Sequence, residues 1–132
     1  MSVALAKVLW QQASENAPLS ALVSGRIYVE HGPKNPMLPL IIISYGGSST
    51  EQFQSSVRHE ASVTAEVFMS RDVDYSTVMA IDDALYTACE GASRTDVAGF
   101  DRGVILCRSR GALATYDDAY GVTSEWTVNA WQ

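Results

Sequence analysis

The longest regular pattern in the chain is an alternation of apolar and polar side chains over positions 57–70. Apolar residues and His59 occupy the odd positions up to Met69, and Phe68 alone breaks the polar series at the even positions. Successive side chains of a strand point to opposite faces of a sheet, so this segment predicts a long strand with one buried and one solvent-facing side. Residues 120–130 alternate in the same way and predict a closing strand.

Residues 3–13 carry apolar side chains at three- and four-residue intervals and predict an N-terminal helix. Asn16 and Pro18 interrupt this pattern, and residues 19–23 then predict one or two further helical turns. Gly25 is expected to end the helical region, because glycine adopts positive φ readily.

Residues 75–88 have the same helical periodicity and predict one central helix. Either Asp72 or Asp74 is placed to cap its first turn by accepting a hydrogen bond from an unpaired backbone N–H. Gly91 is expected to end this helix.

Shorter apolar runs predict the remaining strands, at 27–29, at 40–45 and from 104 onward. Between the first two, residues 31–39 include three prolines and predict an irregular connector. Polar and glycine-rich segments predict loops and turns at 46–56, at 92–99 and at Asp117-Asp118.

The predicted order is helix, three strands, helix and two strands. Such an order favours a single α+β domain spanning residues 1–132. We expect a mostly antiparallel sheet of about five strands, with the N-terminal helix and the central helix packed on one face.

Composition and charge narrow the function classes. Fifteen acidic and nine basic residues give a net charge of −6, which disfavours strong binding to nucleic-acid phosphates. No apolar run approaches the ~20 residues that cross a bilayer, and no signal-peptide pattern follows the first ten residues. We therefore expect that the protein is synthesised in a cytoplasm and does not associate with a membrane. Cys89 and Cys107 are expected to be free thiols.

The sequence contains no pattern that predicts catalysis, a metal site or a cofactor. His59 falls on the apolar side of its strand and is expected to be hydrogen-bonded and half-buried. Asp82 and Asp83 are neighbours on a helix and point about 100° apart, so we interpret them as part of a solvated surface. Neither a nucleophile elbow nor a phosphate-binding loop is present.

The order and spacing of these segments resemble the tail-completion family of long-tailed bacteriophages, which includes tail terminators and tail-to-head joining proteins. The matching segments extend over nearly the whole chain: Leu22–Tyr28, Leu38–Ile42, His59–Ser70, 75–89 and Ser124–Val128.

The resemblance implies a structural virion protein without catalytic residues. It implies a hexameric ring of identical subunits on the last ring of tail tube protein, which ends tail growth and offers a surface to the head-neck connector proteins. Viral DNA is expected to pass through the lumen without sequence-specific binding. The protein is then located in the virion tail or neck and assembled in the cytoplasm of the bacterial host.

Ring assembly requires two different surfaces on each subunit. We predict that these surfaces include residues of the proline connector, of the following polar segment, and of the arginine-rich strand: His31, Lys34 and Asn35; Gln52, Phe53, Gln54 and Arg58; Arg102, Arg108 and Arg110. Arg102, Arg108 and Arg110 also fit a charged solvent face or, as a second interpretation, a binding site for an acidic polymer. Loops 46–56 and 92–99 are expected to be mobile until assembly orders them.

Three alternative functions remain open. The first is an adaptor on the head side of the neck, and the second is a ligand-binding α+β module with an apolar pocket. The third is an enzyme, which the missing nucleophile–base pair disfavours.

Overall fold

The computed structural model describes residues 2–34, 37–115 and 119–132. Three helices and six strands are formed by these residues: α1 (Ser2–Ser14), α2 (Ala17–Leu22), β1 (Ile27–Val29), β2 (Leu40–Gln52), β3 (Val57–Ser70), α3 (Tyr75–Cys89), β4 (Ser93–Val97), β5 (Phe100–Thr115) and β6 (Ala119–Trp131). The strands form one sheet in the order β1-β2-β3-β6-β5-β4. Only β1 and β2 are parallel, so the sheet is mixed.

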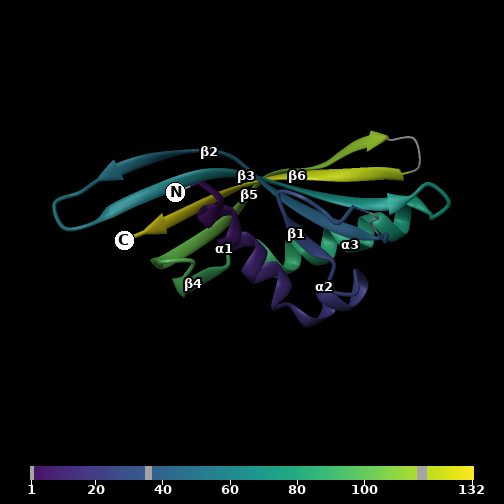
Figure 1. Cartoon of the computed structure of the whole chain (residues 1–132), viewed down its shortest axis with the longest axis horizontal. Helices are drawn as coiled ribbons and strands as arrows, with labels where there is room; N and C mark the ends of the chain where they lie inside the picture. Colours follow the sequence, from purple (N-terminus) through teal and green to yellow (C-terminus); the bar gives the residue numbers. More distant parts are fainter. Residues whose placement is uncertain (1, 35–36, 116–118) are drawn as a thin grey trace.

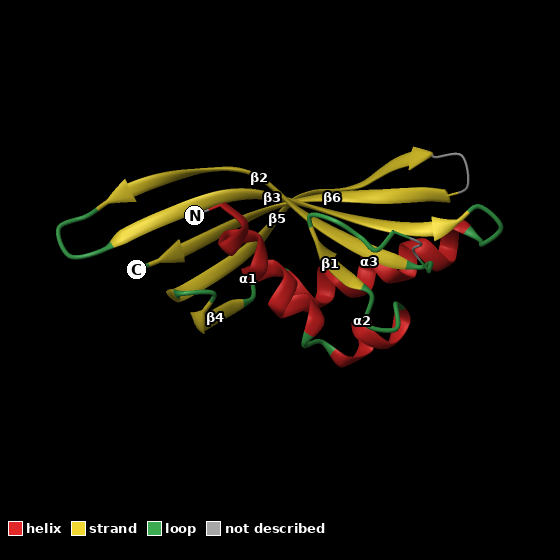
Figure 2. Cartoon of the chain, in the orientation of Figure 1, coloured by secondary structure: helices red, strands yellow, loops and turns green. Residues whose placement is uncertain are grey.

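The three helices lie on one side of a strongly twisted sheet (Figures 1 and 2). The hairpin formed by β2 and β3 extends well beyond the helices at one end of the molecule (Figure 1). β5 and β6 run to the opposite end of the sheet. The molecule is therefore elongated, with a helix-covered face, an open face and a projecting hairpin.

The hydrophobic core lies between the helices and the covered face of the sheet. Its largest fully buried side chain is Trp126, which is 1% exposed, and Leu5 and Leu9 of α1 are completely buried. The odd residues of β3 from His59 to Met69 all face this core, in agreement with the alternation in the sequence. In β6, it is the even residues that point to the same covered face.

α1 approaches the sheet closely at Gly103 of β5. A Cβ atom at this position would lie 2.9 Å from Cγ1 of Val8, closer than real Cβ contacts. Glycine therefore fits here without a clash, whereas a Cβ would force Val8 or α1 to shift.

The N-terminal helix, the central helix and the two long alternating strands are confirmed. The α+β class is also confirmed, but six strands replace the expected five and the sheet is mixed. At the start of α3, Asp74 occupies the N-cap position without a side-chain capping hydrogen bond. Asn16 does cap a helix: its Oδ1 accepts the backbone N–H of Leu19 at 3.0 Å in α2.

Two predicted loops are wrong. β2 continues through 46–52, because a β-bulge between Tyr45 and Ser48 accommodates Gly47 at φ +121° within the strand. Most of 92–99 is β4, which pairs antiparallel with the start of β5. Both segments are hydrogen-bonded strands over most of their length, and their mobility before assembly stays a prediction. Asn35 and Asp117-Asp118 lie outside the described residues.

Candidate functional site

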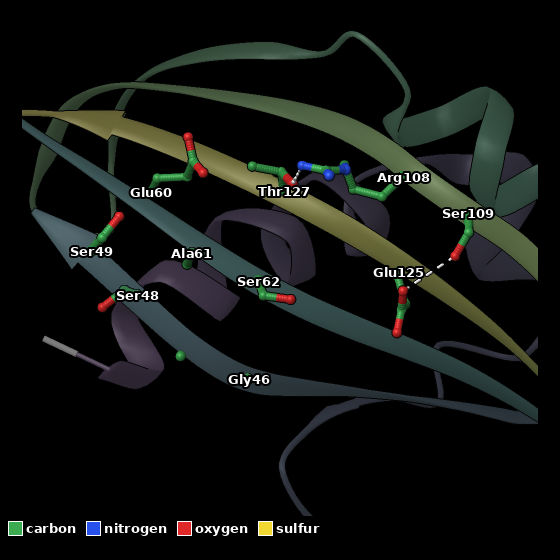
Figure 3. Close-up of a pocket in the computed structure, with 11 residues that line it drawn as sticks. Gly46, Ser48, Ser49, Glu60, Ala61, Ser62, Arg108, Ser109, Glu125 and Thr127 are labelled. Carbon is green, nitrogen blue, oxygen red and sulfur yellow. Dashed lines mark hydrogen bonds between the residues drawn. The ribbon is translucent and has the colours of Figure 1, made fainter.

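The open face of the sheet carries mostly polar side chains. They come from the even residues of β3 and the odd residues of β6, and from neighbouring positions of β2 and β5. Over the centre of this face lies a shallow concavity of about 530 Å³ (Figure 3). Its lining is rich in glycine, hydroxyl and charged residues: Gly46, Gly47, Ser48, Ser49, Glu60, Ala61, Ser62, Arg108, Ser109, Glu125 and Thr127.

Charges of both signs lie on the open face. Arg108 donates a hydrogen bond of 3.4 Å to Thr127, and Ser109 donates one of 3.3 Å to Glu125, as Figure 3 shows. Nearer the β2–β3 tip, Arg58 forms an ion pair of 2.6 Å with Glu51. Among the described residues of this face, arginines are thus accompanied by carboxylates, which weakens the attraction for nucleic-acid phosphates.

The two thiols and the His59 imidazole lie in settings that reduce their reactivity. Burial raises the pKa of Cys89 to about 12, and burial together with the Glu90 charge raises the pKa of Cys107. His59 is 4% exposed, and its ring nitrogens are hydrogen-bonded to Thr50 (3.1 Å) and Gln132 (2.9 Å). The prediction of a hydrogen-bonded histidine is confirmed, and its burial is more complete than expected.

Within the described ranges, no group of three or more His, Cys, Asp and Glu side chains is arranged to hold a metal ion. Over the same residues, none of the helices is long and apolar enough to span a bilayer.

The interpretation of Asp82 as a solvated residue is wrong. It is 1% exposed, and its Oδ2 lies 2.9 Å from the Arg110 guanidinium, which also bonds to the exposed Asp83. The same guanidinium lies 4.6 Å from the centre of the Tyr86 ring. Arg110, predicted as an interface residue, therefore links β5 to α3 within the subunit.

The other predicted interface residues fall into three places. His31 and Lys34 are exposed on the connector after β1. Gln52, Phe53, Gln54 and Arg58 gather at the projecting tip of β2 and β3, where Phe53 is 50% exposed. Arg102 and Arg108 lie on β5, and Arg102 stacks over the Trp131 ring at 5.6 Å. Their role in assembly stays a prediction.

Two glutamates that the sequence analysis did not single out protect the exposed edges of the sheet. Glu30 accepts the backbone N–H of Tyr45 at 2.8 Å, at the point where β2 continues past its pairing with β1. Glu90 accepts the N–H of Cys107 at 2.9 Å, where β5 continues past its pairing with β4. Each carboxylate occupies a backbone donor that would otherwise be open to another strand. Nothing in the local sequence distinguishes these two residues from other surface glutamates.

An apolar groove lies beside β1. It is lined by Lys7 and Trp10 of α1, by Ile27, Tyr28 and Val29 of β1, and by His31. The backbone carbonyls beside it are already occupied: Trp10 Nε1 donates to Ile27 at 2.9 Å, and the His31 N–H donates to Val29 at 2.8 Å. The groove therefore suits an inserted side chain better than an added strand.

Solved structures with this fold include two that match over most of this chain. One is described as the virion of a native gene transfer agent particle; it matches with a TM-score of 0.72 and 16% identity over 94% of this chain and 92% of that chain. The second, whose name describes no function, matches with a TM-score of 0.65 and 10% identity over 93% of this chain and 94% of that chain. No protein-family model and no curated protein sequence matches. The fold of this chain is therefore also the fold of a chain in a virion.

Proposed function

We propose that this chain is a structural virion protein that forms a ring on the end of a phage tail tube. The ring ends tail growth, contacts the head-neck connector proteins and lets viral DNA pass through its lumen. The observation that carries this proposal is the fold similarity, over 94% of the chain, to a chain of a gene transfer agent virion. The resemblance of the sequence to the tail-completion family supports the same assignment.

The surface chemistry is compatible with this role. The open face carries both signs of charge, and the chain as a whole is acidic, with a net charge of −6. Such a surface repels or releases a passing polyanion, which is what a DNA conduit requires. The buried, hydrogen-bonded His59 and the raised pKa values of both thiols support a non-catalytic role.

Deletion of the gene, followed by electron microscopy of the lysate, tests the proposal. We expect tails of irregular, excessive length without attached heads, because nothing stops tube growth. Normal-length tails separated from DNA-filled heads would instead indicate the joining or head-side adaptor role. Normal virions would refute a role in assembly altogether.

A ligand-binding module is the second candidate, favoured by the apolar groove beside β1. Small aromatic compounds titrated into the purified protein distinguish the two. Saturable binding that shifts the NMR signals of Trp10 and Tyr28, together with normal virions after gene deletion, would favour the module.

A further inference from the structure

The β2–β3 hairpin holds an aromatic side chain away from the body of the protein. Phe53 follows the last residue of β2, and half of its surface is exposed. Its backbone N–H donates to Ser56 at 2.8 Å, which closes a tight turn. An exposed aromatic ring on an ordered tip is a typical anchor for a protein–protein contact.

Two interactions stiffen the hairpin behind this tip. The Glu51–Arg58 ion pair of 2.6 Å joins its two strands. Thr50 contacts the ring of His59, which is bound in turn to Gln132, so the hairpin is connected to the end of β6. A tip that is already ordered loses little conformational entropy when it binds.

The groove beside β1 offers a surface of matching chemistry. Trp10 and Tyr28 contribute aromatic rings to a mostly apolar lining, and Lys7 and His31 lie at its exposed parts. Glu51 at the tip is paired with Arg58, but its side chain stays 58% exposed, so its carboxylate can also approach Lys7. The tip projects past the helices, whereas the groove lies between α1 and β1 on the body (Figure 1). The two surfaces therefore meet only between different molecules.

We propose that Phe53 of one subunit inserts into the groove lined by Trp10, Tyr28 and His31 of a second copy of this chain. Tip and groove are different surfaces, so the contact is heterologous. Each subunit then has one tip and one groove to offer, and the contact repeats from copy to copy. A ring forms if the rotation between neighbours closes. This inference rests on the part of the proposed function in which copies of this chain bind one another.

Two variants, one that disables the tip and one that disables the groove, test the contact. Phe53→Ala removes the anchor and leaves the groove intact; Tyr28→Ala alters the groove and leaves the tip intact. Analytical ultracentrifugation at rising concentration should show that each variant alone stays monomeric, whereas wild type forms larger assemblies. A mixture of the two variants should form dimers and nothing larger, because only one functional tip meets one functional groove. Leu113→Ala is the matched control, since Leu113 is similarly exposed, at 56%, but lies on β5.

Disulfide trapping tests the same contact directly. In a Cys107→Ser background, chains with Gln54→Cys and chains with His31→Cys are mixed under oxidising conditions. The mixture should give disulfide-linked dimers, and neither chain alone should give them. Dimers formed by Gln54→Cys chains alone would indicate a tip-to-tip contact and overturn the proposal. Wild-type chains that stay monomeric, with no trapped dimer at any concentration reached, would also overturn it.

The outcomes separate this inference from the proposed function. Overlong tails after gene deletion, combined with no trapping between tip and groove, would retain the tail role and reject this contact. Normal virions combined with efficient trapping would retain the contact and reject the tail role.

Discussion

The guanidinium of Arg110 on β5 lies 2.9 Å from the carboxylate of Asp82 on α3, and Asp82 is buried to 1% exposure. Twenty-eight residues separate the two in sequence. The Tyr86 ring packs against the same guanidinium. This cluster attaches the distal half of β5 to the helix layer, beyond the part of β5 that β4 covers.

Replacing Arg110 by Met should lower the free energy of unfolding by about 2–4 kcal/mol, because the buried Asp82 carboxylate loses the guanidinium cation that pairs with it. Asp83→Asn is the control and should cost less than about 1 kcal/mol, since Asp83 is 67% exposed. Urea unfolding measures both. Equal losses for the two variants would contradict a special role for the buried pair.

Asp82 should also give the protein a distinct pH dependence. Burial raises the pKa of Asp82 above its ordinary value of 3.8, although Arg110 opposes this shift. Between pH 3.8 and the raised pKa, Asp82 is protonated in the folded state and ionised in the unfolded chain. Protonation of Asp82 therefore stabilises the folded state as the pH falls through the raised pKa, and this contribution is complete below 3.8.

The difference in unfolding free energy between wild type and Asp82→Asn should therefore move in favour of wild type as the pH falls from neutral to about 4. Its slope cannot exceed about 1.4 kcal/mol per pH unit for one proton. Urea unfolding in a series of buffers measures it. A difference that stays constant, or that moves in favour of the variant, would show that the pKa of Asp82 is not raised.

Asp82 also shows what periodicity in the sequence does not predict. Periodicity correctly placed Asp82 on a helix, but it assigned this residue to the solvated side. Its burial depends on Arg110 of β5, which follows α3 only after β4 and which the fold brings back into contact with the helix. A pairing between distant elements leaves no local periodic signal.

Some strands could be predicted from local patterns, whereas others depend on pairing with distant strands. The 57–70 strand was predictable because its alternation follows directly from one buried face. The continuation of β2 was not, because Gly46 and Gly47 normally end strands, and here a bulge absorbs them. β4 was missed because only Val97 of its five residues is apolar and buried; pairing with β5 holds the rest. Of the candidate assembly residues, sequence indicated Phe53 and His31, whereas the groove emerged only from packing α1 against β1.

Gly103→Ala should destabilise the protein by about 1–3 kcal/mol, because the added methyl group would overlap Cγ1 of Val8. Val8→Ala alone creates a cavity and should also destabilise. The double variant should lose less than the sum of the two single losses, since the removed branch makes room for the added one. Thermal unfolding of all four proteins completes the cycle. Additive losses would show that the contact between α1 and β5 is not tight.

Glu90 should control the reactivity of Cys107, because its carboxylate binds the backbone N–H of that residue at 2.9 Å and its charge contributes to the raised thiol pKa. Glu90→Gln removes the charge and retains an acceptor for the N–H, so the thiol pKa should fall with little loss of stability. Glu90→Ala also leaves that donor unsatisfied and should cost about 1–2 kcal/mol more than the Gln variant.

The rate of thiol labelling as a function of pH measures the pKa of Cys107, with Cys107→Ser as the blank. Cys89, whose pKa is about 12, should stay unlabelled in the folded protein and serves as an internal reference. If Glu90→Gln leaves the labelling profile unchanged, the Glu90 charge does not contribute to the pKa of Cys107. If Cys89 reacts as well, the substitution has opened the core. The labelling rates of the Gln and Ala variants must then be compared under conditions in which both are equally stable.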